Sequence, residues 1–136
     1  MILPRTLLAQ IHSHLEAGYP HEACGIMLGR GGVVTEIVAA TNTRTDSARN
    51  RYLIDPLQFK AVQLDADKRR LDVLGIYHSH PDVAARPSSF DLENATWPGY
   101  SYLIVSVVKG NAVETTSWQL RDDRSQFDPE PVEIPD

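Results

Sequence analysis

The sequence is best approached from one segment, Tyr77-His78-Ser79-His80-Pro81, followed six residues later by Ser88-Ser89-Phe90-Asp91. His78 and His80 are two residues apart on an extended segment, so their side chains point to the same side and can reach one metal ion together. Asp91 is expected in the first turn of the next short helix, where the connecting loop can return it to the same point. Two imidazoles and one carboxylate form a three-ligand set that suits zinc with its fourth position open to water.

A hydrolytic site of this kind would also need protein groups that transfer protons and stabilise the negative charge of the oxyanion. Zinc lowers the pKa of bound water to about 7, and a nearby carboxylate must then take and return the proton. Glu22, which follows the break at Pro20 and precedes a strand, is the candidate for that role. Ser88 is a candidate donor to a developing oxyanion. Ser88 and Asp91 also fit a capping box at the start of the helix, and the two interpretations are compatible.

Apolar spacing and turn residues predict alternating helices and strands in a single domain. Helices are expected at 4–17, 56–70 and 88–96, and strands at 23–28, 33–40, 73–77, 102–108 and 113–120. The polar stretch 41–51 is expected to be a loop. In the second helix, Leu57, Ala61 and Leu64 are expected to supply the apolar face, with Val62 as a further candidate. This mixture of elements is typical of an α+β fold or an α-β-α sandwich.

Composition limits the kind of protein. The 136 residues include 13 basic and 18 acidic ones, a net charge of −5, and they fit one domain at 1–120 with an acidic, proline-containing tail at 121–136. No basic stripe indicates nucleic-acid binding, no apolar run is long enough to cross a membrane, and no heptad or large apolar patch specifies an oligomer. The single cysteine, Cys24, is expected to be a buried small hydrophobe, which fits a reducing cytoplasm.

The combination resembles the JAMM metalloprotease motif, also called MPN+, which is written E…H-S/T-H-P-x(6)-S-x-x-D. Glu22 supplies its first position, and the segment from His78 to Asp91 supplies the remainder with the expected spacing. Further stretches look like the small bacterial members of this family. They are Pro20-His21-Glu22-Ala23-Cys24-Gly25, Arg51-Tyr52 with Asp55-Pro56, and Tyr102-Leu103-Ile104-Val105-Ser106.

The resemblance implies a cytidine-deaminase-like fold, in which a curved and mostly antiparallel sheet lies between helices. It implies that His78, His80 and Asp91 hold one zinc ion per chain. Glu22 would be the general acid/base, and Ser88 would stabilise the tetrahedral intermediate. The reaction would be hydrolysis of a peptide or isopeptide bond at the C-terminal Gly-Gly of a ubiquitin-like protein. Small bacterial members act on ubiquitin-like sulfur-carrier proteins and release an amino acid such as cysteine or expose the Gly-Gly end.

Two other classes of protein remain as alternatives. A non-catalytic MPN-type scaffold binds partners without a metal, but such a protein typically lacks some ligands or the glutamate, and all are present here. A zinc-stabilised binding module needs a fourth protein ligand, which only His21 or Cys24 could supply if the backbone near Glu22 turned inward. The zinc deaminases require P-C-x-x-C, which one cysteine cannot provide. The second histidine pair, His12-Ser13-His14, lies on a predicted helix, where positions i and i+2 diverge, so it is expected at the surface.

Overall fold

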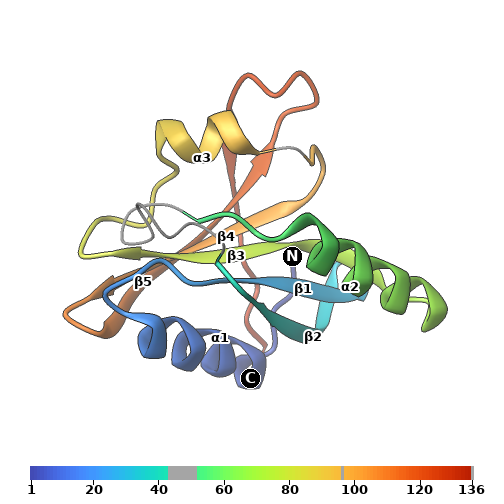
Figure 1. Cartoon of the computed structure of the whole chain (residues 1–136), viewed down its shortest axis with the longest axis horizontal. Helices are drawn as coiled ribbons and strands as arrows, with labels where there is room; N and C mark the ends of the chain where they lie inside the picture. Colours follow the sequence, from blue (N-terminus) through green and yellow to red (C-terminus); the bar gives the residue numbers. More distant parts are fainter. Residues whose placement is uncertain (43–51, 96, 136) are drawn as a thin grey trace.

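The computed structural model describes residues 1–42, 52–95 and 97–135, so the loop expected at 41–51 lies almost wholly outside the described residues. Among these residues six strands form one sheet in the order β2-β1-β3-β4-β5-β6, and of the strand pairs described the β3–β4 pair alone is parallel. Helix α1 covers one face, and α2 and α3 lie over the other (Figure 1). The elements are α1 (Arg5–Gly18), β1 (Cys24–Arg30), β2 (Val33–Ala40), α2 (Pro56–Lys68), β3 (Asp72–Pro81), α3 (Ser89–Asn94), β4 (Ser101–Val108), β5 (Asn111–Leu120) and β6 (Phe127–Glu130). The α+β fold with a mostly antiparallel sheet between helices is therefore confirmed.

Helix α1 packs flat on the sheet. Ile11 and Leu15 are fully buried in the cluster that includes Tyr77 of β3. His12 and His14 were expected at the surface, and that prediction is wrong, because both are half-buried. His12 Nε2 lies 2.8 Å from Thr115 Oγ1, and His14 Nδ1 lies 2.8 Å from the Tyr77 hydroxyl. The helix lies so close to the strands that even its flanking side chains reach polar groups of the sheet.

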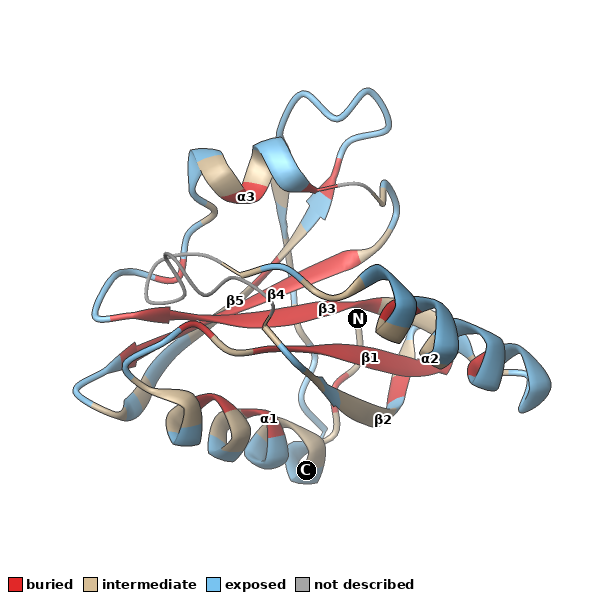
Figure 2. Cartoon of the chain, in the orientation of Figure 1, coloured by how far each residue is buried: buried red, intermediate tan, exposed pale blue. Residues whose placement is uncertain are grey.

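The buried face of helix α2 differs from the one that its apolar spacing predicted. Phe59 and Ala66 are 7% and 1% exposed, whereas Leu57 and Leu64 are 77% and 53% exposed. Ala61 is exposed as well, and the outward face of α2 is visible in Figure 2. Phe59 and Leu57 belong to two different apolar stripes, and packing against the sheet selects the one that carries the larger aromatic side chain.

Strand β3 extends beyond the predicted end at Tyr77 and includes both histidines. His78 is paired with Cys24 of β1, and His80 is paired with Ser106 of β4. The two predicted metal ligands therefore lie on a central strand and not in a loop. Its alternating residues Ile76, His78 and His80 face the side covered by α2 and α3.

Part of the acidic tail belongs to the sheet. β6 pairs antiparallel with β5, and the Phe127 ring packs against Tyr102 with centroids 5.2 Å apart. Among the described residues, no helix combines the length and apolar character needed to cross a lipid bilayer.

Candidate metal centre

His78, His80 and Asp91 converge in a buried cluster beneath α3. The Nε2 atoms of the two histidines are 3.2 Å apart. Asp91 Oδ2 lies 3.0 Å from His80 Nε2, and Asp91 Oδ1 lies 3.4 Å from His78 Nε2. The three residues are only 1%, 5% and 8% exposed. Three potential ligand atoms therefore point at one another from two segments separated by a loop.

The arrangement fits zinc. A tetrahedral zinc ion with bonds of about 2.0–2.1 Å separates its ligand atoms by about 3.3–3.4 Å. The 3.2 Å between the two Nε2 atoms is close to that edge length, and each imidazole has an Asp91 oxygen at a similar distance, Oδ1 at 3.4 Å from His78 and Oδ2 at 3.0 Å from His80. Three protein ligands of nitrogen and oxygen leave one position for water or substrate, as in catalytic zinc sites. The donor set and its spacing thus suit a catalytic rather than a closed structural ion.

Charges within the cluster favour an ionised carboxylate. Burial alone would raise the pKa of Asp91, but the charge of His78 and hydrogen bonds from His78, His80 and the Ser88 backbone hold it well below its usual value. Burial lowers the pKa of His78, against the raising effect of the Asp91 carboxylate. For His80, burial opposes protonation, but the hydrogen bonds to Asp91 and Ala84 outweigh it and raise the pKa. An anionic carboxylate beside imidazoles is the ligand state that a divalent metal requires.

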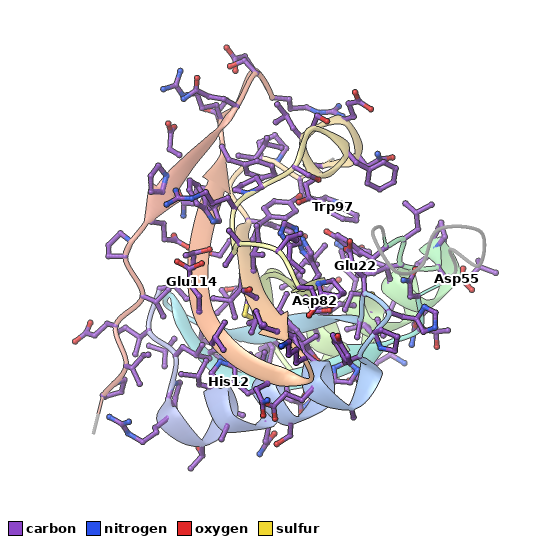
Figure 3. The ribbon with its side chains drawn as sticks, turned by 90° about the vertical axis from the view of Figure 1, so that its left-hand side faces the viewer. His12, Glu22, Asp55, Asp82, Trp97 and Glu114 are labelled. Carbon is purple, nitrogen blue, oxygen red and sulfur yellow. The ribbon has the colours of Figure 1, made fainter. Side chains whose placement is uncertain are left out.

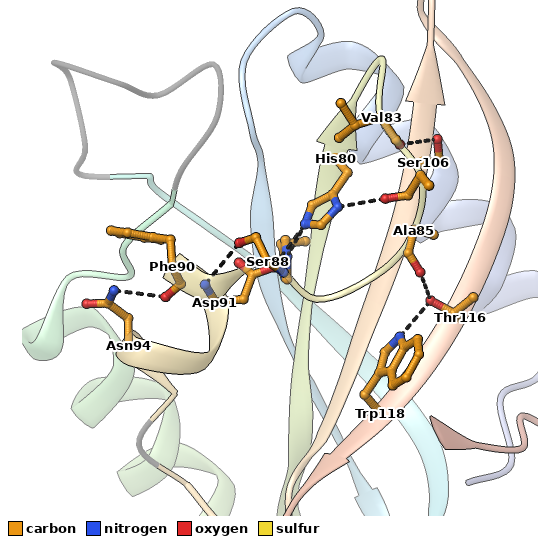
Figure 4. A network of polar contacts seen from close by, with 12 residues as sticks. His80, Val83, Ala85, Ser88, Phe90, Asp91, Asn94, Ser106, Thr116 and Trp118 are labelled. Carbon is orange, nitrogen blue, oxygen red and sulfur yellow. Dashed lines mark hydrogen bonds and ion pairs between the residues drawn. The ribbon is translucent and has the colours of Figure 1, made fainter. Parts of the chain in front are cut away.

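Ser88 and Asp91 are tied together at the start of α3. Ser88 N donates to Asp91 Oδ2 at 2.9 Å, and Asp91 N donates to Ser88 Oγ at 3.1 Å, which completes a capping box. The predicted cap is thus present, and the same carboxylate also faces the two histidines (Figure 4). Because the Ser88 hydroxyl accepts the bond from Asp91 N, its own hydrogen remains available as a donor.

His80 is oriented by the loop that follows it. Its Nδ1 lies 2.9 Å from the carbonyl oxygen of Ala84, and since a carbonyl can only accept, Nδ1 carries the hydrogen and Nε2 is left to bind a metal. Side chains from β4 and β5 hydrogen-bond to this loop. The spacing of the motif does not predict these contacts. Two of these contacts are drawn in Figure 4, Ser106 Oγ to the Val83 carbonyl and Thr116 Oγ1 to the Ala85 carbonyl. The third is Ala85 N to Glu114 Oε1.

Glu22 lies just before β1 and is 5% exposed (Figure 3). Its segment is fixed to the histidine strand, because Ala23 N donates to Ser79 Oγ at 2.9 Å and Ser79 N donates to the Ala23 carbonyl at 3.0 Å. The charge of Glu22 helps to raise the pKa of His80, so the carboxylate lies within electrostatic reach of the cluster. Glu22 is not one of the three grouped ligands. His21 is exposed, and neither it nor buried Cys24 belongs to the group.

Two residues that the motif did not indicate lie near the candidate site, Tyr52 against His78 and Asn42 against the Glu22 segment. The Tyr52 ring stacks on the His78 imidazole with centroids 4.3 Å apart. Asn42 Nδ2 donates to the Glu22 carbonyl at 2.9 Å. Beside them a cavity of 340 Å³ opens on the α2/α3 side of the sheet, with a mostly apolar lining. Its walls include Tyr52, Ile54, Phe59, Ile76, Phe90 and Trp97.

Comparison with known proteins identifies relatives of one kind. A desampylase of Haloferax volcanii is 37% identical over 89 residues, which cover 64% of this chain and 63% of its own length. A probable TtuB-protein conjugate cleaving protease of Thermus thermophilus is 34% identical over 97 residues, covering 71% and 64%. The match thus spans less than two thirds of either of these curated relatives. A CysO-cysteine peptidase of Mycobacterium tuberculosis is 28% identical over 123 residues, covering 90% of this chain and 84% of its own.

Solved structures agree with the fold. A protein from Salinibacter ruber is 42% identical, covers 100% of this chain and 92% of its own, and superposes with a TM-score of 0.77. A structure described as a JAMM metalloprotease-like zinc site in the proteasome and signalosome covers 100% and 98% with a TM-score of 0.65, and at 20% identity it supports the fold alone. The family model for prokaryotic homologs of the JAB domain matches residues 4–121. The chain therefore belongs to the prokaryotic JAB-domain family, the JAMM/MPN-type proteins that its motif resembles.

Proposed function

We propose that this chain is a zinc metallopeptidase that hydrolyses the bond following the C-terminal Gly-Gly of a ubiquitin-like sulfur-carrier protein. The bond is a peptide or isopeptide bond, and the released group includes an amino acid such as cysteine. The reaction takes place in the cytoplasm, as expected from the single, reduced cysteine.

The observation that carries the proposal is the convergence of His78, His80 and Asp91. The Nε2 atoms of the two histidines are 3.2 Å apart, and Asp91 places Oδ1 3.4 Å from His78 Nε2 and Oδ2 3.0 Å from His80 Nε2. In this proposal these three residues hold the zinc ion, one per chain. When bound, the ion would act as a Lewis acid and lower the pKa of water, so that water can act as a nucleophile at neutral pH. A structural ion would need a fourth protein ligand, and the group of described residues has three.

Two other residues carry the proton and charge steps. Glu22 takes a proton from the attacking water and returns it to the leaving amine nitrogen, which needs a carboxylate close to the cluster but outside the ligand set. Its burial before β1 and its electrostatic effect on His80 support this role. Ser88 donates its hydroxyl hydrogen to the oxyanion that forms on the scissile carbonyl. The capping bond at Asp91 N fixes the position of the Ser88 oxygen for this purpose.

The substrate class is supported by the relatives. Their names describe a desampylase, a protease that cleaves TtuB-protein conjugates, and a peptidase acting on CysO-cysteine. The peptidase aligns over the largest share of this chain among the three, 90%, which favours release of a single amino acid from a sulfur carrier. Cleavage of a carrier attached through a lysine side chain is the related outcome that the other two names favour.

A paired measurement tests the proposal. Zinc per chain is measured by elemental analysis, and cleavage is measured on a Gly-Gly-terminated ubiquitin-like carrier extended by one cysteine, with and without chelator. We expect about one zinc ion and cleavage that chelator abolishes and added zinc restores. A second substrate, the carrier joined to a lysine side chain, separates the two kinds of bond.

Each other result has a defined meaning. Zinc without cleavage of either substrate would remove the sulfur-carrier assignment. A chain that binds no zinc and cleaves neither substrate, even after zinc is added, would favour the alternative of a non-catalytic MPN-type interaction scaffold.

A further inference from the structure

We infer that Tyr52 is a positioning residue that holds the His78 imidazole in its ligating orientation by ring stacking. Asn42 keeps the Tyr52 segment aligned with the segment that carries Glu22. The inference rests on the proposed metal site and concerns how this chain orients one of its ligands.

The two histidines are oriented by different means. His80 donates from Nδ1 to the Ala84 carbonyl at 2.9 Å, the usual way in which a protein fixes a ligating imidazole. His78 Nδ1 is buried, and no hydrogen-bond partner for it is found among the described residues. Since Nε2 of His78 faces His80 and Asp91, a neutral ligating imidazole carries its hydrogen on Nδ1. Within the described part of the chain, packing is therefore what sets the rotation of this ring.

Tyr52 provides that packing. The two ring centroids are 4.3 Å apart and the planes are inclined by 24°, so the rings lie nearly face to face. His78 is 1% exposed, and its ring also lies 5.1 Å from the His80 ring at an angle of 53°. A flat surface against one face of an imidazole resists rotation about χ2, the torsion that decides whether Nε2 points at the metal position. An aliphatic side chain would fill similar space without imposing a plane.

The Tyr52 segment is itself anchored beside Glu22. Leu53 N donates to Asn42 Oδ1 at 3.0 Å, and Asn42 Nδ2 donates to the Glu22 carbonyl at 2.9 Å. An isolated antiparallel bridge joins Asn42 and Ile54. One asparagine thus connects the backbone of the proposed proton carrier with the residue after Tyr52. The segment that stacks on the proposed ligand His78 and the segment that carries the proposed proton carrier Glu22 are therefore both held by Asn42.

The test compares variants of the full chain that differ in the shape of residue 52. In Tyr52→Leu the planar surface is lost, whereas Tyr52→Phe retains the ring and removes only the hydroxyl. Tyr100→Leu is the matched control, because Tyr100 is also half-buried and stacks on Trp97, with centroids 5.8 Å apart, and not on His78. Zinc affinity is measured by competition with a chromophoric chelator, and the visible absorption of the Co²⁺-loaded chain reports ligand geometry. Thermal unfolding of the metal-free chain reports structural damage separately.

We expect Tyr52→Leu to weaken zinc binding by about 10- to 100-fold, the range found when groups that orient metal ligands are removed. The Co²⁺ spectrum should change with it. Tyr52→Phe should keep the zinc affinity and the Co²⁺ spectrum of the unsubstituted chain. Tyr100→Leu should leave the affinity for zinc unchanged. If Tyr52→Leu does not fold, Tyr52→Met, which keeps bulk without a ring, is measured in its place.

Wild-type zinc affinity and an unaltered Co²⁺ spectrum in a folded Tyr52→Leu or Tyr52→Met chain would overturn the inference while leaving the metallopeptidase proposal intact. An equal loss of zinc affinity in Tyr100→Leu would also overturn it, because the effect would then come from weaker aromatic packing on this side of the sheet and not from the ring that stacks on His78. Absence of zinc binding by the unsubstituted chain would overturn both proposals.

Discussion

Replacing Glu22 by Gln separates proton transfer from metal binding. The side chain keeps its size, and the segment remains fixed by the two hydrogen bonds between Ala23 and Ser79. Glu22 lies outside the group of three potential ligands, so the change leaves the His78, His80 and Asp91 cluster complete. Only a carboxylate that can take and return a proton is lost.

The size of the effect follows from that single loss. A positioned general acid or base contributes about 10²- to 10⁴-fold to a rate, or about 2.7–5.4 kcal/mol in transition-state free energy. We therefore expect kcat to fall by about 10²- to 10⁴-fold and zinc content to remain near one per chain. In His80→Ala, by contrast, zinc affinity itself should fall, because a ligand atom at the centre of the cluster is removed.

The assay is cleavage of the carrier extended by one cysteine, with zinc measured on the same samples. Glu16→Gln is the matched control, because Glu16 accepts a bond from Ala112 N at 2.8 Å on the opposite side of the sheet and should leave kcat unchanged. A zinc-loaded Glu22→Gln chain that cleaves at the wild-type rate would refute the assignment of Glu22 as proton carrier.

Three further predictions concern catalysis, packing and pH. Ser88→Ala should lower kcat by about 10²-fold through loss of an oxyanion donor and destabilise the chain by about 1 kcal/mol through loss of the cap, which kinetics and thermal unfolding measure separately; an unchanged kcat would remove Ser88 from the mechanism. Phe59→Ala should cost about 3–5 kcal/mol in urea unfolding and Leu57→Ala less than about 0.5 kcal/mol, whereas equal costs would contradict the observed orientation of α2. Burial and the charge of Glu22 raise the pKa of the Cys24 thiol to about 12, so alkylation of the native chain should be very slow at pH 8 and rise towards pH 12; rapid reaction at pH 8 would contradict the burial of Cys24.

Features set by neighbouring residues were predictable from the sequence. The β1–β2 hairpin follows from the glycines between two apolar runs, and Gly31 and Gly32 adopt φ values of 58° and 76° that favour glycine. The cap at Ser88 follows from its spacing to Asp91, and the convergence of His78 and His80 follows from the two-residue period of a strand. In each case the deciding interaction lies within a short stretch of chain.

Features set by distant contacts were not predictable in this way. The spacing of Leu57, Ala61 and Leu64 is compatible with a buried face, and only the position of the sheet relative to α2 selects Phe59 instead. Tyr52 contacts His78 from 26 positions earlier in the chain, in a segment whose sequence has no regular period. Ring stacking of this kind depends on tertiary structure, so neither composition nor motif spacing indicates it.

The one parallel pair of strands explains why Asp91 meets the histidines. Antiparallel neighbours can be joined by a tight turn, but β3 and β4 run in the same direction, so the chain leaving Pro81 must travel back along the sheet before β4 begins at Ser101. That return path contains α3, which lies over the same face of the sheet as α2 (Figure 1). A residue midway along the path is therefore carried over the end of β3 that it has just left. The hydrogen bond from Ser88 N then holds the Asp91 carboxylate toward the two imidazoles. The strand topology thus brings the third proposed ligand close, and the helix cap orients it.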